Sequence, residues 1–155
     1  LGARVSVVRR TPDGSGRTLG PDQWRARLGE FDWVILSLPA TAETKHMIGV
    51  AELAAMKPTA VLLNVARGSV LDQQALVDAL QEGRIAGAFL DVTDPEPLPA
   101  DHVLWGLPNA HIAMHLSGRS QTGSVQRAAH RFLENLARYR SGEPLHNQVD
   151  LGLGY

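Results

Sequence analysis

Short apolar runs alternate along this chain with longer segments of helical spacing. The runs have the length of strands, and the run over 60–65 is almost continuously apolar, as strands buried on both faces of a sheet are. The five runs are 5–8, 31–38, 60–65, 85–92 and 110–114. They predict five strands distributed along the chain.

The segments between and after these runs predict helices. The clearest has Asp72 as its N-cap, apolar residues at 75, 76, 79 and 80 on one face, and Gly83 as its stop. A long helix is expected over 125–137, where apolar residues again recur on a single face. Shorter helices are expected at 21–28 and 50–56.

Strands that alternate with helices predict an α/β fold with a parallel sheet and crossover helices. Ligands of such sheets bind beyond the carboxyl ends of the strands. Each predicted strand of this chain has polar or glycine-containing residues at its end: 9–10, 38–41, 66–68, 91–96 and 115–118. The sequence therefore predicts a binding site at this edge of the sheet.

The composition narrows the classes of function. The 155 residues are 44% hydrophobic and 20% charged, with a net charge of -1, so neither nucleic acid nor an anionic membrane is an expected partner. No apolar run approaches the roughly 18–20 residues of a membrane-spanning helix. The absence of cysteine excludes disulfides, thiolate metal ligands and cysteine nucleophiles. A cytoplasmic protein is expected.

Four motifs in order carry a specific resemblance. They are 36–44 (LSLPATAET), 64–69 (NVARGS), 91–97 (DVTDPEP) and 109–118 (NAHIAMHLSG). Together they resemble the D-2-hydroxyacid dehydrogenase family, and most of all its glyoxylate/hydroxypyruvate reductase branch. The resemblance covers nearly the whole chain. It implies a Rossmann-type doubly wound sheet and a homodimeric NAD(P)-dependent oxidoreductase that acts on a small 2-oxo or 2-hydroxy acid.

The resemblance implies three catalytic residues. Arg67 matches the arginine that binds the substrate, and its guanidinium fork suits a bidentate grip on a carboxylate or keto oxygen. His115 matches the acid/base residue that exchanges a proton with the substrate oxygen. Glu96 matches the carboxylate that pairs with this histidine and favours its imidazolium form.

The resemblance also implies a set of residues that bind the cofactor. Asp91 matches the residue that contacts the nicotinamide carboxamide. The full expected set is Arg9, Arg10, Leu38, Pro39, Thr44, Val65, Ala66, Arg67, Asp91, His115, Ser117 and Gly118.

Residues after the first predicted strand favour NADP(H), with NAD(H) as the alternative cofactor. The end of this strand meets the adenine ribose in dinucleotide domains, and an acidic residue there selects NAD. Here the strand is followed by Arg9-Arg10-Thr11-Pro12, with no carboxylate before Asp13. Arginine at this place can hydrogen-bond a 2′-phosphate and balance its charge.

A dinucleotide domain begins with a strand, a GxGxxG turn and a helix whose N-terminus binds the pyrophosphate. The chain shows none of these, and Gly2 resembles the residue that closes such a helix. We therefore expect a fragment: a nucleotide-binding domain over 1–141 without its first strand and glycine loop, and a tail over 142–155 that returns toward an absent substrate domain. Loss of that central strand would expose the apolar strands beside it.

Two other functions and a metal site are weighed against the dehydrogenase. A corepressor-like, non-enzymatic module that senses NAD(H) could keep all three catalytic residues. A formate-dehydrogenase-like enzyme would have glutamine where Glu96 stands. His111 and His115 could share one face of a strand, but the chain offers no third metal ligand at convincing spacing, so no metal is expected.

Overall fold

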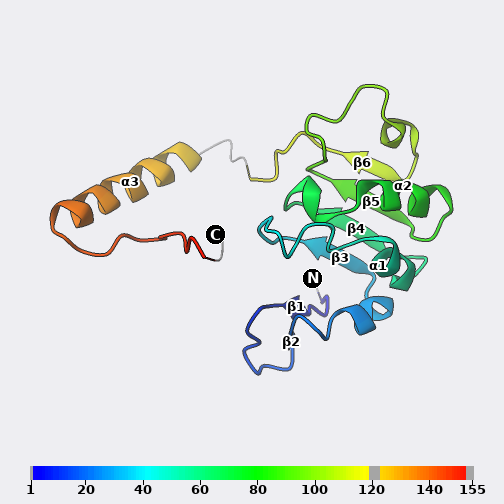
Figure 1. The fold of residues 1–155 in the computed structure, drawn as a ribbon, viewed down its shortest axis with the longest axis horizontal. Coiled ribbons are helices and arrows are strands. Elements are labelled where there is room, and N and C mark those ends of the chain that lie inside the picture. The colour runs from blue at the N-terminus through cyan, green and yellow to red at the C-terminus, as the bar shows by residue number, and fades with distance from the viewer. Residues whose placement is uncertain (1, 119–122, 153–155) are drawn as a thin grey trace. The chain divides into compact units, whose positions relative to one another are not determined.

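The computed structural model describes residues 2–118 and 123–152. The chain divides into two compact units, Leu1–Met114 and His115–Tyr155. The first unit contains all the strands, and the second contains the long helix α3 (Ser124–Arg140). Figure 1 shows the elements in chain order.

A four-stranded parallel sheet forms the centre of the first unit (Figure 1). Its strands lie in chain order: β3 (Trp33–Leu36), β4 (Val61–Asn64), β5 (Gly87–Leu90) and β6 (Ala110–Ile112). Leu36 is paired with Asn64, Asn64 with Leu90, and Leu90 with Ile112. The four carboxyl ends are thus in register, and the loops that follow them begin at one edge of the sheet, as the sequence predicted.

Two helices connect the strands and pack against one another, α1 (Val50–Ala55) and α2 (Gln73–Gln81). The Asp72 carboxylate caps α2 by accepting a hydrogen bond from the Ala75 backbone at 3.1 Å. Gly83 follows the helix with φ +66°, a conformation that costs glycine little. The residues expected on the apolar face of α2 are all buried. Both predicted ends of this helix are therefore confirmed.

A second, two-stranded parallel sheet pairs β1 (Val7–Val8) with β2 (Thr18–Leu19) and is separate from the first. Strand β3 is the outer strand of the larger sheet, and its Trp33 and Ile35 side chains are 62% and 60% exposed. Val7 and Val8 of β1 are exposed as well. The two sheets therefore each have an outer strand, β3 and β1, with exposed apolar side chains.

Several elements differ from the predictions. The expected helix over 21–28 is a turn followed by a 3-10 helix, η1 (Arg25–Glu30). Short elements that were not predicted include β2 and the 3-10 helix η3 (Val103–Gly106) inside a proline-rich loop. The observed strands are shorter than the apolar runs, because each is hydrogen-bonded only where a neighbouring strand lies beside it. A further 3-10 turn, η2 (Gly68–Val70), follows β4.

In the second unit, the tail after α3 folds back onto that helix. The Asn135 side chain donates to the His146 carbonyl at 3.1 Å and accepts from the His146 N–H at 2.8 Å. Arg138 Nε donates to the Pro144 carbonyl at 2.6 Å. None of the residues of α3 is buried, so its predicted apolar face, including Phe132, is exposed. The domain boundary expected at residue 141 stays a prediction.

Among the described residues, no helix has both the length and the apolar character that crossing a membrane requires.

Candidate functional site

A hollow of about 490 Å³ lies beyond the carboxyl ends of β3 and β4. The loops that follow the two strands line it, with Ser37, Leu38, Pro39, Ala40, Val65, Ala66 and Arg67. Five of the predicted site residues are in this set: Leu38, Pro39, Val65, Ala66 and Arg67. The structure therefore brings them together at the predicted edge of the sheet, and their roles stay predictions.

The loop that carries Arg67 is held by the last residue of β4. Asn64 is fully buried; its amide nitrogen donates to the Arg67 carbonyl at 3.0 Å, and its Oδ1 accepts from the Ala66 N–H at 3.0 Å. The backbone on both sides of the Ala66–Arg67 peptide is thus fixed by one buried amide. The Arg67 side chain is exposed, and its Nη1 donates to the Ala66 carbonyl at 2.7 Å.

The loop that carries Glu96 packs directly on the residue after Arg67. A Cβ placed on Gly68 would lie 2.0 Å from the Thr93 carbonyl oxygen and 2.6 Å from the Asp94 nitrogen. Only a residue without a side chain allows these two backbones to approach so closely. Thr93 is buried, and its hydroxyl donates to the Pro95 carbonyl at 2.9 Å. Arg67 and the loop of Glu96 are therefore neighbours, and the Glu96 side chain is exposed.

Asp91 is the first residue after β5 and is 2% exposed. Its backbone N–H donates to the Asn64 carbonyl at 2.9 Å, which places it next to the end of β4. This position agrees with the cofactor contact that the resemblance implies.

The loop after β3 is closed by Thr44. Its hydroxyl donates to the Pro39 carbonyl at 2.8 Å and accepts from the Thr41 N–H at 2.8 Å. His46 N–H donates to the Ser69 carbonyl at 2.8 Å, which ties this loop to the one that follows β4. Thr44, predicted as a cofactor-binding residue, thus shapes one wall of the hollow through its hydrogen bonds.

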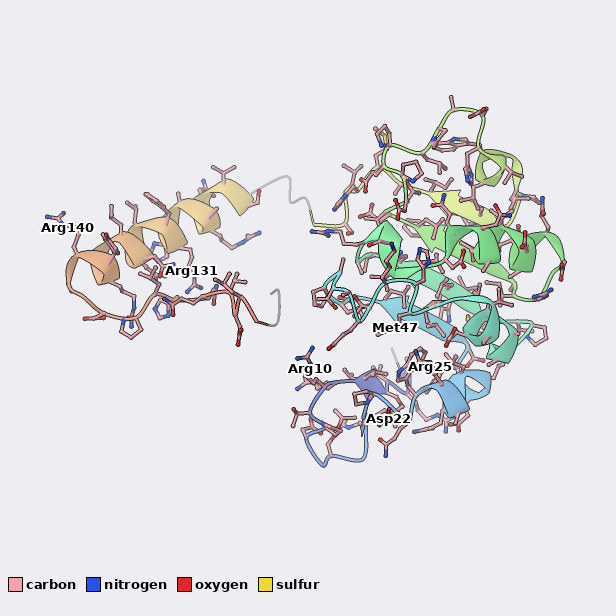
Figure 2. All side chains as sticks on the ribbon, viewed as in Figure 1. Arg10, Asp22, Arg25, Met47, Arg131 and Arg140 are labelled. Atoms are coloured by element: carbon pink, nitrogen blue, oxygen red, sulfur yellow. The ribbon has the colours of Figure 1, made fainter. Side chains whose placement is uncertain are left out.

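The two arginines after β1 are exposed. Arg10 Nη2 lies 3.1 Å from Glu43 Oε2, an ion pair between the segment after β1 and the loop after β3. Figure 2 shows Arg10 extending from the part of the chain that contains the two-stranded sheet. Both arginines follow a strand of the first unit, where the sequence placed them.

His115, Ser117 and Gly118 belong to the second unit. His115 is half-buried and has a left-handed backbone with φ +54°. The approach of these residues to Arg67 and Glu96 stays a prediction.

Sequence reasoning missed Asn64 and Gly68 as site residues. A polar residue that ends an apolar strand, and a glycine directly after a binding arginine, were the available signals. The glycine signal does not indicate which loop Gly68 contacts, because that depends on the packing of segments about 25 residues apart in the chain. The Asn64 side chain instead hydrogen-bonds within its own loop, to Ala66 and Arg67.

The hollow fits part of a dinucleotide cofactor. Its wall combines the apolar side chains of Leu38, Pro39 and Val65 with backbone and guanidinium polar groups, and Asp91 follows the next strand. Concave sites with apolar walls and a few polar groups are typical of cofactor binding. In an open parallel sheet they lie beyond the carboxyl ends of the strands, as this one does.

Comparisons with known proteins agree with this fit. Residues 1–117 match the family described as D-isomer specific 2-hydroxyacid dehydrogenase, NAD binding domain. A glyoxylate reductase from Thermococcus gammatolerans is 47% identical over 116 residues, which are 75% of this chain and 34% of that protein.

Two solved structures share the fold closely. A D-isomer specific 2-hydroxyacid dehydrogenase from Xanthobacter autotrophicus, in complex with NADPH and MES, is 36% identical with a TM-score of 0.91 and covers 99% of this chain and 64% of that one. An NADPH-dependent glyoxylate/hydroxypyruvate reductase from Sinorhizobium meliloti, in complex with NADP and sulfate, is 28% identical, also with a TM-score of 0.91. It covers 99% of this chain and 50% of that one.

The chain spans about half the length or less of the curated relatives it matches. The family match nevertheless covers most of the chain and includes every strand of the two sheets. The chain therefore belongs to the D-isomer specific 2-hydroxyacid dehydrogenase family, and it carries that family's NAD-binding domain.

Proposed function

We propose that the protein is an NAD(P)-dependent oxidoreductase that reduces a small 2-oxo acid of the glyoxylate or hydroxypyruvate type. One observation carries the proposal: Arg67 lines the hollow beyond β3 and β4, and the next residue, Gly68, packs against the loop of Glu96. The closeness of these two segments supports a shared site in which the Arg67 guanidinium binds the substrate and Glu96 supplies the carboxylate.

In this reaction, the nicotinamide cofactor supplies the hydride that reaches the carbonyl carbon of the substrate. Arg67 holds the substrate carboxylate and orients the carbonyl toward the hollow. The His115 imidazolium donates its proton to the carbonyl oxygen and becomes neutral, so the product is the 2-hydroxy acid. Glu96 pairs with the imidazolium, stabilises its charge and fixes the orientation of the ring. In oxidation the same residues act in reverse.

A turnover assay with the complete protein tests this proposal. We expect NADPH oxidation with glyoxylate or hydroxypyruvate, and a slower reaction with 2-oxo acids of larger side chain. Cofactor binding without turnover of any 2-oxo acid would contradict the proposal and favour the corepressor-like module. Light scattering on the same preparation tests the expected homodimer.

We propose further that the enzyme prefers NADPH to NADH. Support comes from Arg9 and Arg10 after β1, and from the two solved relatives, whose structures contain NADPH and NADP. Charge-assisted hydrogen bonds from arginine to a phosphate contribute about 1.5–3 kcal/mol each, or roughly a 10- to 100-fold preference.

The preference is measured as the ratio of kcat/KM for the two cofactors. The double variant Arg9→Ala/Arg10→Ala is expected to lose most of the ratio through a weaker reaction with NADPH, while the reaction with NADH changes little. Arg84→Ala is the control, because Arg84 is exposed and pairs with Glu82 after α2. An NADH preference in the wild type, or an unchanged ratio in the double variant, would show that these arginines do not bind the phosphate.

A further inference from the structure

Gln73, the first residue of α2, reaches the loop of Glu96 with its side chain. Its Oε1 accepts a hydrogen bond from the Asp94 backbone N–H at 3.0 Å. Its Nε2 lies 3.3 Å from His102 Nε2. The side chains of Gln73 and His102 are half-buried, whereas Asp94 is exposed.

The anchored backbone belongs to the loop that carries Glu96. Asp94 precedes Glu96 by two residues, and the Glu96 side chain itself is exposed. Gly68 contacts this loop at Thr93 and Asp94 through close backbone packing. Gln73 adds a directional hydrogen bond at Asp94, whereas the Gly68 contact restricts only how closely the loop approaches.

The ring of His102 has a defined proton arrangement. Its Nδ1 accepts from the Leu104 N–H at 3.2 Å, so a neutral ring carries its proton on Nε2. That proton points at an amide nitrogen of Gln73, which is also a donor. A carboxylate at position 73 would accept hydrogen bonds from both the Asp94 N–H and the His102 Nε2–H. Gln73→Glu therefore keeps the hydrogen bond to Asp94 and gives the His102 ring an acceptor.

We propose that Gln73 is a positioning residue for the reaction: by holding the Asp94 backbone, it fixes the loop that carries Glu96. The inference rests on the proposed function, in which Glu96 stabilises the imidazolium of His115. Gln73 contacts neither substrate nor cofactor in this account and acts only through the loop.

The test compares Gln73→Leu, Gln73→Glu and Gln74→Leu in the complete enzyme. Gln74 is the matched control, because it is the adjacent glutamine of α2, is exposed, and donates to Asp78 of the same helix at 2.9 Å. Gln73→Leu is expected to make the reduction rate fall off at lower pH, the direction expected for Glu96→Gln, and to lower kcat roughly two- to tenfold, the value of one hydrogen bond. Gln73→Glu should retain the wild-type profile, and Gln74→Leu should change neither.

Backbone hydrogen exchange of the 93–97 segment provides a readout that does not depend on activity. Exchange should be faster in Gln73→Leu and unchanged in Gln73→Glu and Gln74→Leu. Unchanged exchange in Gln73→Leu would overturn the inference, as would an unshifted pH profile when Glu96→Gln does shift it. An unshifted profile in Glu96→Gln would instead overturn the role of Glu96 in the proposed function, and the exchange result would still decide whether Gln73 anchors the loop.

Discussion

At the scale of single residues, the candidate site depends on groups that never reach the substrate. Asn64 holds the backbone on both sides of Arg67, and Gly68 lets the loop of Glu96 approach that backbone. Family motifs identify the residues that face the hollow, because these carry the chemistry. They do not identify residues such as Asn64 and Gly68, whose role is to fix or admit the backbone of a loop, because that role depends on the contacts in the folded chain.

Gly68→Ala is expected to damage the site through packing alone. The new methyl group would meet the Thr93 and Asp94 backbone, which cannot move as a flexible side chain could. Overpacking of this kind costs about 1–3 kcal/mol, and here it would displace the loop of Glu96 from Arg67. We expect a lower urea midpoint and a kcat/KM reduced by at least roughly tenfold, since small misplacements of catalytic groups are costly.

Gly106→Ala is the matched control for this variant. No atom lies within 4 Å of a Cβ built on Gly106. This variant should retain both the wild-type midpoint and kcat/KM. Equal behaviour of the two variants would contradict the packing account.

At the scale of elements, the sequence predicted those helix ends that neighbouring residues determine. The helix α2 begins after Asp72 and ends before Gly83 because a side-chain cap and a left-handed glycine act within a few residues. The strand β2 and the 3-10 helix η3 were missed because neither has a repeating apolar pattern. The two residues of β2 form a strand only because they pair with β1, which lies beside them.

The start of α1 depends on a carboxylate whose charge couples stability to pH. Glu52 accepts from the Gly49 N–H at 3.1 Å and from Arg25 Nε at 2.8 Å, which joins α1 to η1. Burial raises the pKa of Glu52, but the hydrogen bonds from Arg25 and the backbone outweigh it and lower the pKa below the usual 4.5. Figure 2 shows Arg25 beside these short helices.

Glu52→Gln is therefore expected to lower stability at pH 7 by about 1 kcal/mol, given the exposure of Arg25. The stabilising contribution is present above pH 4.5 and is lost as the pH falls through the lowered pKa of the folded state. Urea midpoints of wild type and variant should differ at pH 7 and converge toward pH 3. Glu82→Gln, which alters an exposed pair after α2, should show no such dependence. A constant difference between Glu52→Gln and wild type at all pH values would refute the coupling.

At the scale of the whole molecule, strand order determines where the chemistry is placed. Because β3 to β6 are parallel and adjacent, the segments 37–40, 65–68 and 91–96 begin at one edge, although they are far apart in the sequence. Alternation of strands and helices was enough to predict this arrangement. The relation of His115 to Arg67 and Glu96 could not be derived in this way, since His115 belongs to a separate compact unit.

The central claim is that Arg67, Glu96 and His115 act together on a 2-oxo acid. The most direct measurement is steady-state reduction of glyoxylate or hydroxypyruvate by the complete enzyme at saturating NADPH, with His115→Ala compared with wild type. The account predicts a kcat lower by roughly 10²–10⁴, the value of a positioned acid/base group. A His115→Ala enzyme that retains the wild-type kcat would contradict it.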